Sequence, residues 1–403
     1  MLKPAAPTLP TEIAREKAPS YRLLSLLNYA LVILMGLGWN LIGPALPAMR
    51  NEFSLSVASV GIVFPLATAG FALAVMIAGY VVDSYGRRPV LVGTSLMLGL
   101  GYLGWGLAPH WTVMAGIMFF TGAGLGCIDI ITNVTTSDAS SGDRVADLNR
   151  LHMFFGLSAV LSPLLIGLSL DVNWRLPMIA IGLLGFACLP LTFRVQLPQA
   201  ASIERLSRDN VIPLARNGLI TMITAVLVLY IWVEVSLIGW GVTYVTEVFQ
   251  EPYGQSTVLV SLFWGAIFLG RLAIVWLSRR LTTEQIMQIP LIASAPLILV
   301  VGLAPSVLVI YAAVFLLGLC LAPVFPTMFA VALQRFPRRP GTVSIVLLLG
   351  AALGGLLPPY VIGVLAENLS FRIAMLSLVP IALVMPFLTH FAFRRARQGT
   401  DAA

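Results

Sequence analysis

Charge is scarce in this sequence. Lys, Arg, Asp and Glu together account for 10% of the 403 residues, whereas a soluble globular domain carries roughly 25%. Hydrophobic residues account for 59% and lie in continuous runs of about 20 residues or more, the length that crosses a bilayer as a helix. The shortage of charge excludes a soluble domain, and the continuous runs exclude a transmembrane β-barrel, in which apolar and polar residues alternate. We therefore predict an all-α, multi-pass membrane protein.

Side chains suited to covalent or metal chemistry are also few. Each of the three cysteines, Cys127, Cys188 and Cys320, falls within an apolar run, and their spacing suits neither a disulfide nor a metal site. The polar segments contain no nucleophile beside a base and no phosphate-binding loop. We expect that the protein is not an enzyme and that it holds no metal and no cofactor, although H+ or Na+ could serve as a coupling ion.

The order of apolar runs predicts about twelve transmembrane helices. The longest internal polar segment, 195–216, predicts a cytoplasmic linker between an N-terminal six-helix bundle, 22–194, and a C-terminal one, 217–393. Residues 1–21 and 394–403 are polar and are predicted to be cytoplasmic tails. The expected spans are 22–48, 57–82, 90–108, 111–137, 148–171 and 174–194 in the first bundle, then 217–248, 256–278, 284–303, 306–334, 341–366 and 371–393 in the second.

Basic residues are distributed unevenly along these spans. If both termini are cytoplasmic, only Arg50, Arg175 and Arg372 lie near the outer turns. Such asymmetry follows the positive-inside rule and accounts for the net charge of +7 without a nucleic-acid partner. We expect a multi-pass protein of the inner (plasma) membrane that acts as a monomer in the lipid bilayer on a small-molecule substrate.

The two halves repeat one another weakly. Arg87 and Arg88 recur as Arg279 and Arg280. The pair Trp174-Arg175 likewise recurs as Phe371-Arg372, whereas Asp83 aligns with Val275 and has no acidic counterpart. Parallel repeats of this kind place a solute cavity between the halves, near the bilayer midplane.

The segment GYVVDSYGRRPV joins the second and third spans. Its residues Gly79, Asp83, Gly86, Arg87 and Arg88 resemble the loop between helices two and three of the major facilitator superfamily. The resemblance implies the major facilitator fold, with two pseudo-symmetric halves, and a latch in which the acid and the arginines stabilise one conformation. The alternative is a positive-inside loop whose acid caps a helix.

Polar side chains inside the spans are costly to insert, so they are candidates for function. Asp129 and Asn133 are four residues apart and share one helix face, as either a solute-binding pair or a structural contact. His152 could titrate near neutral pH or form an interhelical hydrogen bond. Arg271 could join the latch by pairing with Asp83, pair with an acid in the seventh span, or lie at the membrane boundary as a snorkelling charge. We assign solute binding to Asn40, Asp129, Asn133, Glu234, Trp240 and Trp264, and ion coupling to Asp129, Glu234 and His152.

Five further segments, GLGCIDIITN, LNRLHMFFGLSAVLSP, LYIWVEVSLIGW, FWGAIFLGR and LAPVFPTM, look like the fucose, galactose and glucose symporter branch of that superfamily. The resemblance implies that Asp129 acts in coupling and sugar recognition, and that Asn133, Glu234 and Trp264 line the cavity. The first span lacks the acid that this branch carries, so proton coupling through one acid, sodium coupling and uncoupled transport all stay open. The expected function is cation-coupled sugar symport by a rocker-switch mechanism. The alternatives are a drug or metabolite efflux antiporter and a non-transporting receptor.

Overall fold

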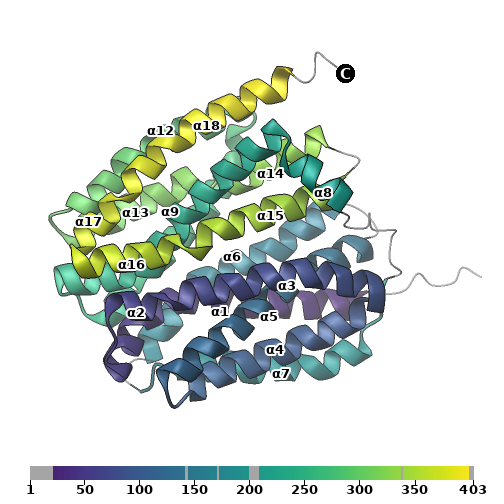
Figure 1. The fold of residues 1–403 in the computed structure, drawn as a ribbon, viewed down its shortest axis with the longest axis horizontal. Coiled ribbons are helices and arrows are strands. Elements are labelled where there is room, and N and C mark those ends of the chain that lie inside the picture. Colours follow the sequence, from purple (N-terminus) through teal and green to yellow (C-terminus); the bar gives the residue numbers. More distant parts are fainter. Residues whose placement is uncertain (1–20, 141–143, 170–171, 199–207, 337–338, 399–403) are drawn as a thin grey trace, which may run out of the picture.

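The computed structural model describes residues 21–140, 144–169, 172–198, 208–336 and 339–398. Within these segments the chain forms helices and turns and no strand. Twelve helical stretches are long and apolar enough to cross a membrane, which confirms the predicted fold class. Figure 1 shows the helices gathered into two bundles that lie side by side, the first in purple to blue and the second in green to yellow.

The first bundle contains seven described helices. Its first helix is five residues longer than predicted, because the polar segment after the apolar run stays helical up to the left-handed residue Ser54 (φ 52°). Gly86 (φ 84°) separates the third helix from the fourth, in a backbone region that favours glycine. The helices are α1 (Arg22–Phe53), α2 (Val57–Gly61), α3 (Val63–Tyr85), α4 (Arg87–Leu107), α5 (Trp111–Ala139), α6 (Arg144–Ser169) and α7 (Leu176–Arg194).

The second bundle follows α8 (Arg208–Ala215), which lies in the predicted linker. Prolines interrupt two of its spans: Pro323 stands between two helices, and Pro358 begins another, because proline lacks the N–H that continues a helix. The helices are α9 (Gly218–Phe249), α10 (Tyr253–Ser256), α11 (Val258–Leu277), α12 (Thr283–Leu303), α13 (Val307–Leu321), α14 (Val324–Arg335), α15 (Pro340–Leu356), α16 (Pro358–Asn368), α17 (Phe371–Leu376) and α18 (Leu378–Gln398).

The structure gives the two repeated arginines the same task. Arg175 Nη1 donates to the carbonyl oxygens of Gly106 and Ala108, both at 3.0 Å, where α4 ends. Arg372 Nη1 donates to the corresponding carbonyls at the end of α12, at 3.2 and 2.9 Å. The last carbonyls of a helix have no partner within it and carry partial negative charge. Each arginine therefore closes one helix end in its own bundle.

Glycines bring α3 and α5 into backbone contact. A Cβ added at Gly126 would lie 2.6 Å from the Phe71 carbonyl oxygen, and one at Gly122 would clash with the carbonyl of Ala67. Any side chain at these positions would therefore push the two helices apart. The contact fixes the position of the α5 face that carries the predicted site.

Contacts between the bundles concentrate at one end of the molecule, which we call the α2 end after the helix that lies there (Figure 1). The opposite end, with α8 and the last turn of α18, is the α8 end. At the α2 end Arg50 of α1 forms an ion pair with Glu247 of α9. The backbone N–H of Ala58 donates to Glu367 Oε2 at 2.6 Å, and the Tyr253 hydroxyl donates to a carbonyl of α1. The bundles are thus joined at the α2 end.

Candidate functional site

One face of α5 carries a linked carboxylate and amide. Asn133 Nδ2 donates to the Asp129 side-chain Oδ1 at 3.0 Å and to the Asp129 backbone carbonyl at 2.7 Å. His152 on α6 extends this chain, because its Nε2 lies 3.1 Å from Asn133 Oδ1. The Asn133 Oδ1 is a carbonyl oxygen and can only accept a hydrogen bond. With the Asn133 amide assigned in this orientation, the donor is therefore the protonated Nε2 of His152. The structure thus brings three predicted site residues into one cluster.

A second cluster belongs to the other bundle. Glu234 on α9 is 7% exposed, and the hydroxyl of Tyr230, one helical turn earlier, donates to its Oε2. The Arg271 guanidinium on α11 acts electrostatically on both side chains. A buried carboxylate needs hydrogen bonds or opposite charge, and these neighbours supply both. The sequence prediction did not include Tyr230, although its spacing of four from Glu234 would have identified it.

Arg271 relates the two clusters. Its charge also acts on His152 of the first bundle, while no described residue forms an ion pair with it. Its Nε is buried and has no hydrogen-bond partner in the described part of the chain. Of the alternatives for Arg271, its charge lies near Glu234, the acid of the seventh span. The side chain of Asp83 lies outside the described residues, so the assignment of Arg271 to the latch stays a prediction. We call the following residues the central polar group: Asp129, Asn133, His152, Tyr230, Glu234 and Arg271.

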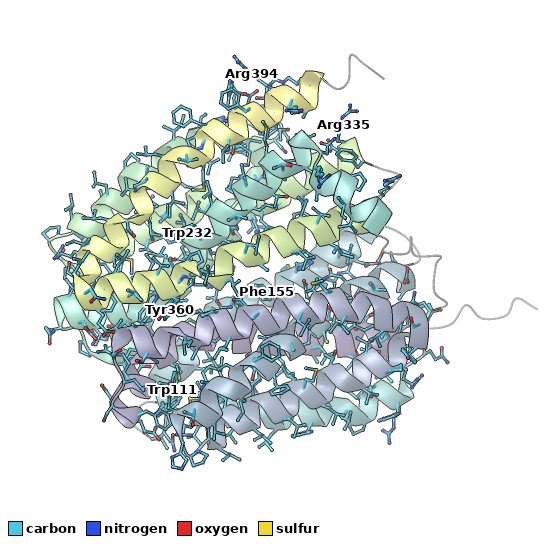
Figure 2. The ribbon with its side chains drawn as sticks, viewed as in Figure 1. Trp111, Phe155, Trp232, Arg335, Tyr360 and Arg394 are labelled. Atoms are coloured by element: carbon cyan, nitrogen blue, oxygen red, sulfur yellow. The ribbon has the colours of Figure 1, made fainter. Side chains whose placement is uncertain are left out.

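Aromatic rings pack where the bundles meet. The rings of Phe155 on α6 and Trp264 on α11 meet edge-on, with centroids 5.8 Å apart, and Figure 2 shows Phe155 between the two bundles. The Trp264 Nε1 is buried and finds no acceptor among the described residues. A buried indole N–H usually has a hydrogen-bond partner, so this donor is left unsatisfied in the conformation described.

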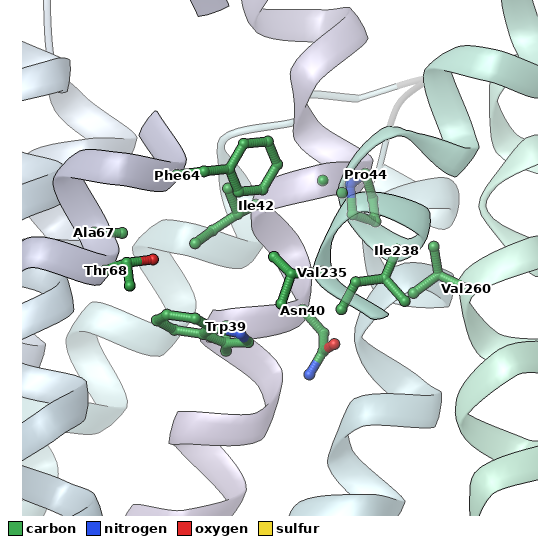
Figure 3. A pocket seen from close by; sticks show the side chains of 12 residues that line it. Trp39, Asn40, Ile42, Pro44, Phe64, Ala67, Thr68, Val235, Ile238 and Val260 are labelled. Carbon is green, nitrogen blue, oxygen red and sulfur yellow. The ribbon is translucent and has the colours of Figure 1, made fainter. Parts of the chain in front are cut away.

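A small pocket lies between α1, α3, α9 and α11 (Figure 3). Its cavity volume of about 20 Å³ has room for about one water molecule. Asn40 lines it, and the Asn40 Nδ2 donates to the Gly36 carbonyl at 2.9 Å. The Asn40 Oδ1 is buried and has no partner in the segments described. Asn40 therefore offers a free acceptor, but a sugar fits beside it only after the bundles move apart.

Comparison with known protein families identifies the family of this chain. The family model described as Major Facilitator Superfamily matches residues 29–357. The chain belongs to the Major Facilitator Superfamily. It is accordingly a membrane transporter rather than an enzyme, and the predicted family is confirmed.

Two curated relatives of this chain differ in what their names describe. The glucose/mannose transporter GlcP of Bacillus subtilis is 22% identical over 358 residues, which cover 84% of this chain and 86% of GlcP. The multidrug resistance protein MdtL of Escherichia coli is 28% identical over 188 residues, which cover 45% of this chain and 48% of MdtL. The match to GlcP thus extends over both bundles, whereas the match to MdtL spans about half of each chain.

A solved structure shares the whole fold. A bacterial homologue of the human lysosomal transporter Spinster, in an inward-facing and unoccupied conformation, aligns with a TM-score of 0.77. The alignment covers 95% of this chain and 99% of that one at 15% identity. At this identity the comparison shows the superfamily fold alone.

The predicted latch residues of this transporter lie near the α8 end. Arg87 is 5% exposed and forms an ion pair with Asp138 of α5. Arg88 donates to the carbonyl oxygens of Thr192, Phe193 and Val195 at the end of α7, at 2.9, 2.6 and 3.0 Å. These contacts tie α4 to α5 and α7 within the first bundle. Gly86 ends α3, as described above. The burial and contacts of Gly79 and of the Asp83 side chain, two other predicted members, lie outside what the structure describes.

Trp240 occupies a different place from the other predicted binding residues. Its side chain has no exposed surface, and its Nε1 donates to the Pro359 carbonyl oxygen at 2.6 Å. Its ring packs against Phe64 of the first bundle and Phe371 of the second, with both centroid distances 6.0 Å. In this conformation Trp240 therefore seals the α2 end and is not open to a solute.

Sequence reasoning also missed the charged contacts of the α2 end. Arg50 was expected near an outer turn, but neither Glu247 nor Glu367 was assigned to it or to α2. Acidic residues at the ends of spans facing a lone arginine are the signal that could have suggested them. Within the described residues, no three His, Cys, Asp or Glu side chains lie close enough together to hold a metal ion.

Proposed function

We propose that this transporter moves a sugar across the membrane together with a cation and works by alternating access. The observation that supports this most strongly is the central polar group. It places one carboxylate on each bundle, Asp129 and Glu234, with the Arg271 charge acting on the second of them and on His152. A solute bound there touches both bundles, so its binding senses how they are arranged.

The chemistry of the central polar group suits a polyhydroxylated solute. Carboxylate and amide oxygens accept hydrogen bonds from sugar hydroxyls, and the free Nε1 of Trp264 donates one. The flat face of an indole also packs against the apolar face of a sugar ring. The match to GlcP over most of both chains supports the same substrate class.

The same two carboxylates support the proposed coupling to a cation. An acid inside a membrane protein exchanges protons with whichever side its cavity faces, and a carboxylate beside carbonyl oxygens can instead hold Na+. Asp129 and Glu234 are therefore the proposed coupling residues, with His152 as a proton-carrying neighbour. If both termini are cytoplasmic, the joined α2 end faces outward, and the conformation described here is the inward-facing one.

Drug or metabolite efflux is the second candidate. It is favoured by the match to MdtL, but that match spans only about half of each chain. The fifth span carries Ser162-Pro163 without the glycine-rich motif that the superfamily's exporters usually have. We therefore favour sugar symport over efflux.

The test is uptake of a panel of labelled monosaccharides into proteoliposomes under an imposed proton or sodium gradient. Accumulation of one sugar under one gradient would support both parts of the proposal. The matched control is Glu251→Gln, which removes an acid at the α2 end and should leave accumulation intact. If no sugar accumulates under either gradient while a drug or metabolite panel shows gradient-driven flux, the symport proposal is wrong. Binding without any flux would indicate a receptor.

A further inference from the structure

The dibasic pair that recurs in the two bundles is used differently in each. In the first bundle Arg87 forms an ion pair with Asp138, and Arg88 donates hydrogen bonds to main-chain carbonyls. In the second bundle Arg279 and Arg280 are exposed. Among the described residues, neither guanidinium takes part in an ion pair or a side-chain hydrogen bond. Two adjacent charges are thus left for something outside the chain.

The surface next to this pair is an apolar stripe along α11. Leu269, Leu272 and Trp276 are 48%, 56% and 55% exposed, and their spacing of three and four places them on one helix face. Large apolar side chains exposed on a membrane helix contact lipid. The stripe ends at the α8 end, and Arg280 stacks there over the Trp276 ring, 4.4 Å from its centroid. An exposed aromatic ring at the end of such a stripe lies at the level of the lipid headgroups.

We infer that Trp276, Arg279 and Arg280 form a binding site for the phosphate of an anionic phospholipid. The acyl chains lie along the apolar stripe of α11. The stacked indole holds the Arg280 guanidinium at headgroup depth, where its planar fork can donate two hydrogen bonds to phosphate oxygens. Arg279 adds a second charge, which favours a headgroup with net negative charge over a zwitterionic one.

Nearby negative charge is too weak to cancel the site. The C-terminal end of a helix carries about half a negative charge, which two guanidinium groups exceed. Glu284, the first acid after the pair, is already engaged by Arg397 and lies 3.2 Å from His390 Nδ1. The net field at the pair is therefore positive.

The experiment measures binding of phosphatidylglycerol to the purified full-length protein in neutral detergent, by titration and native mass spectrometry. Phosphatidylcholine of the same chain length and inorganic phosphate are the comparison ligands. The double variant R279Q/R280Q should bind phosphatidylglycerol about 30-fold more weakly, because each arginine near a membrane surface contributes about 1 kcal/mol and 1.4 kcal/mol is tenfold. W276L should weaken binding about two- to fivefold, the value of an exposed cation–π contact of about 0.5 to 1 kcal/mol.

The matched control is R394Q/R395Q, which removes the same two charges from the end of α18. Retained phosphatidylglycerol binding in this control, together with loss in R279Q/R280Q, supports the site. Equal losses of phosphatidylglycerol affinity in both double variants would mean that only net charge matters, and would overturn the proposal. Phosphatidylcholine binding as tight as phosphatidylglycerol binding would overturn it as well. If inorganic phosphate binds as tightly as the lipid, the site holds a free anion and the lipid proposal is wrong. If R279Q/R280Q does not fold, W276L decides alone, and unchanged lipid binding by it contradicts the proposal.

Discussion

The α2 end and the central polar group handle charge in opposite ways. At the α2 end Arg50 pairs with Glu247 and Glu367 accepts from the Ala58 N–H, so each of these three charged side chains has a partner in the other bundle. In the centre Arg271 has no ion-pair partner among the described residues. Its positive charge interacts with both Glu234 and His152. Satisfied pairs hold one arrangement of the bundles, whereas an unsatisfied group stays available for a solute or an ion. The difference separates the part that joins the bundles in this conformation from the part that we propose binds the solute.

Neutralising a central carboxylate should have the largest effect on transport. We expect Asp129→Asn and Glu234→Gln each to reduce gradient-driven accumulation to the level of protein-free liposomes, because neither side chain can then exchange a proton or hold a cation. Counterflow, which needs no net ion movement, should partly survive in Asp129→Asn. Equal loss of accumulation and counterflow would mean that Asp129 only binds the solute or supports the helix.

Removing the ring that seals the α2 end should have the largest effect on stability. Trp240 is fully buried, and replacing a buried tryptophan by alanine typically costs about 3 to 5 kcal/mol. We expect Trp240→Ala to lower the thermal unfolding temperature of the detergent-purified protein by many degrees. Trp240→Phe keeps one aromatic ring but loses the hydrogen bond to Pro359 and the volume of the second ring, so it should cost less than Trp240→Ala. An unchanged unfolding temperature in Trp240→Ala would show that the ring does not hold the α2 end closed.

The repeated arginines allow the two bundles to be compared directly. Arg175 and Arg372 make the same carbonyl contacts, but Arg175 also pairs with Glu52 at 2.6 Å. Glu52 is 41% exposed, so this pair should add no more than about 1 kcal/mol. We expect Arg175→Ala to lower stability slightly more than Arg372→Ala in denaturant unfolding. The difference should vanish in a Glu52→Ala background, and a difference that persists there would have another cause.

The exposed pair at the α2 end should give the smallest change. Arg50 and Glu247 are 22% and 40% exposed, so their interaction is worth about 0.2 to 1 kcal/mol. In a background without the native cysteines, Ala67→Cys reports opening, because this residue lines the small pocket and is 1% exposed. Arg50→Ala, Glu247→Ala and the double variant should each raise its labelling rate up to about fivefold, without additivity. Fully additive rates would mean that the pair does not couple the bundles.

Much of the fold could be predicted from the sequence because it depends on local properties. Apolar runs of sufficient length located the twelve spans. The four-residue spacing of Asp129 and Asn133 predicted a shared helix face, and the two do form a hydrogen bond. Boundaries were less accurate where polar residues at the membrane surface stayed helical, as before Ser54.

Partners on different helices could not be predicted, because they depend on how the helices dock. Arg87 and Asp138 are 51 residues apart, and Arg50 and Glu247 are 197 apart. No periodicity relates such positions. Burial was misjudged for the same reason: Trp240 has apolar neighbours in the sequence on either side, but only the docked bundles show that its ring is closed off at the α2 end.

The glycine contact between α3 and α5 has a consequence for how the two regions communicate. Because the backbones pack closely at Gly122 and Gly126, we expect the two helices to shift together. Thr68 of α3 donates to the Gly355 carbonyl of the second bundle at 3.1 Å, while α5 carries Asp129. Parting the bundles at that hydrogen bond therefore also changes the separation of Asp129 from Glu234. If the central polar group binds the solute as proposed, its affinity and the accessibility of the α2 end depend on the same movement of the bundles. A ligand that favours one arrangement of the bundles then changes both.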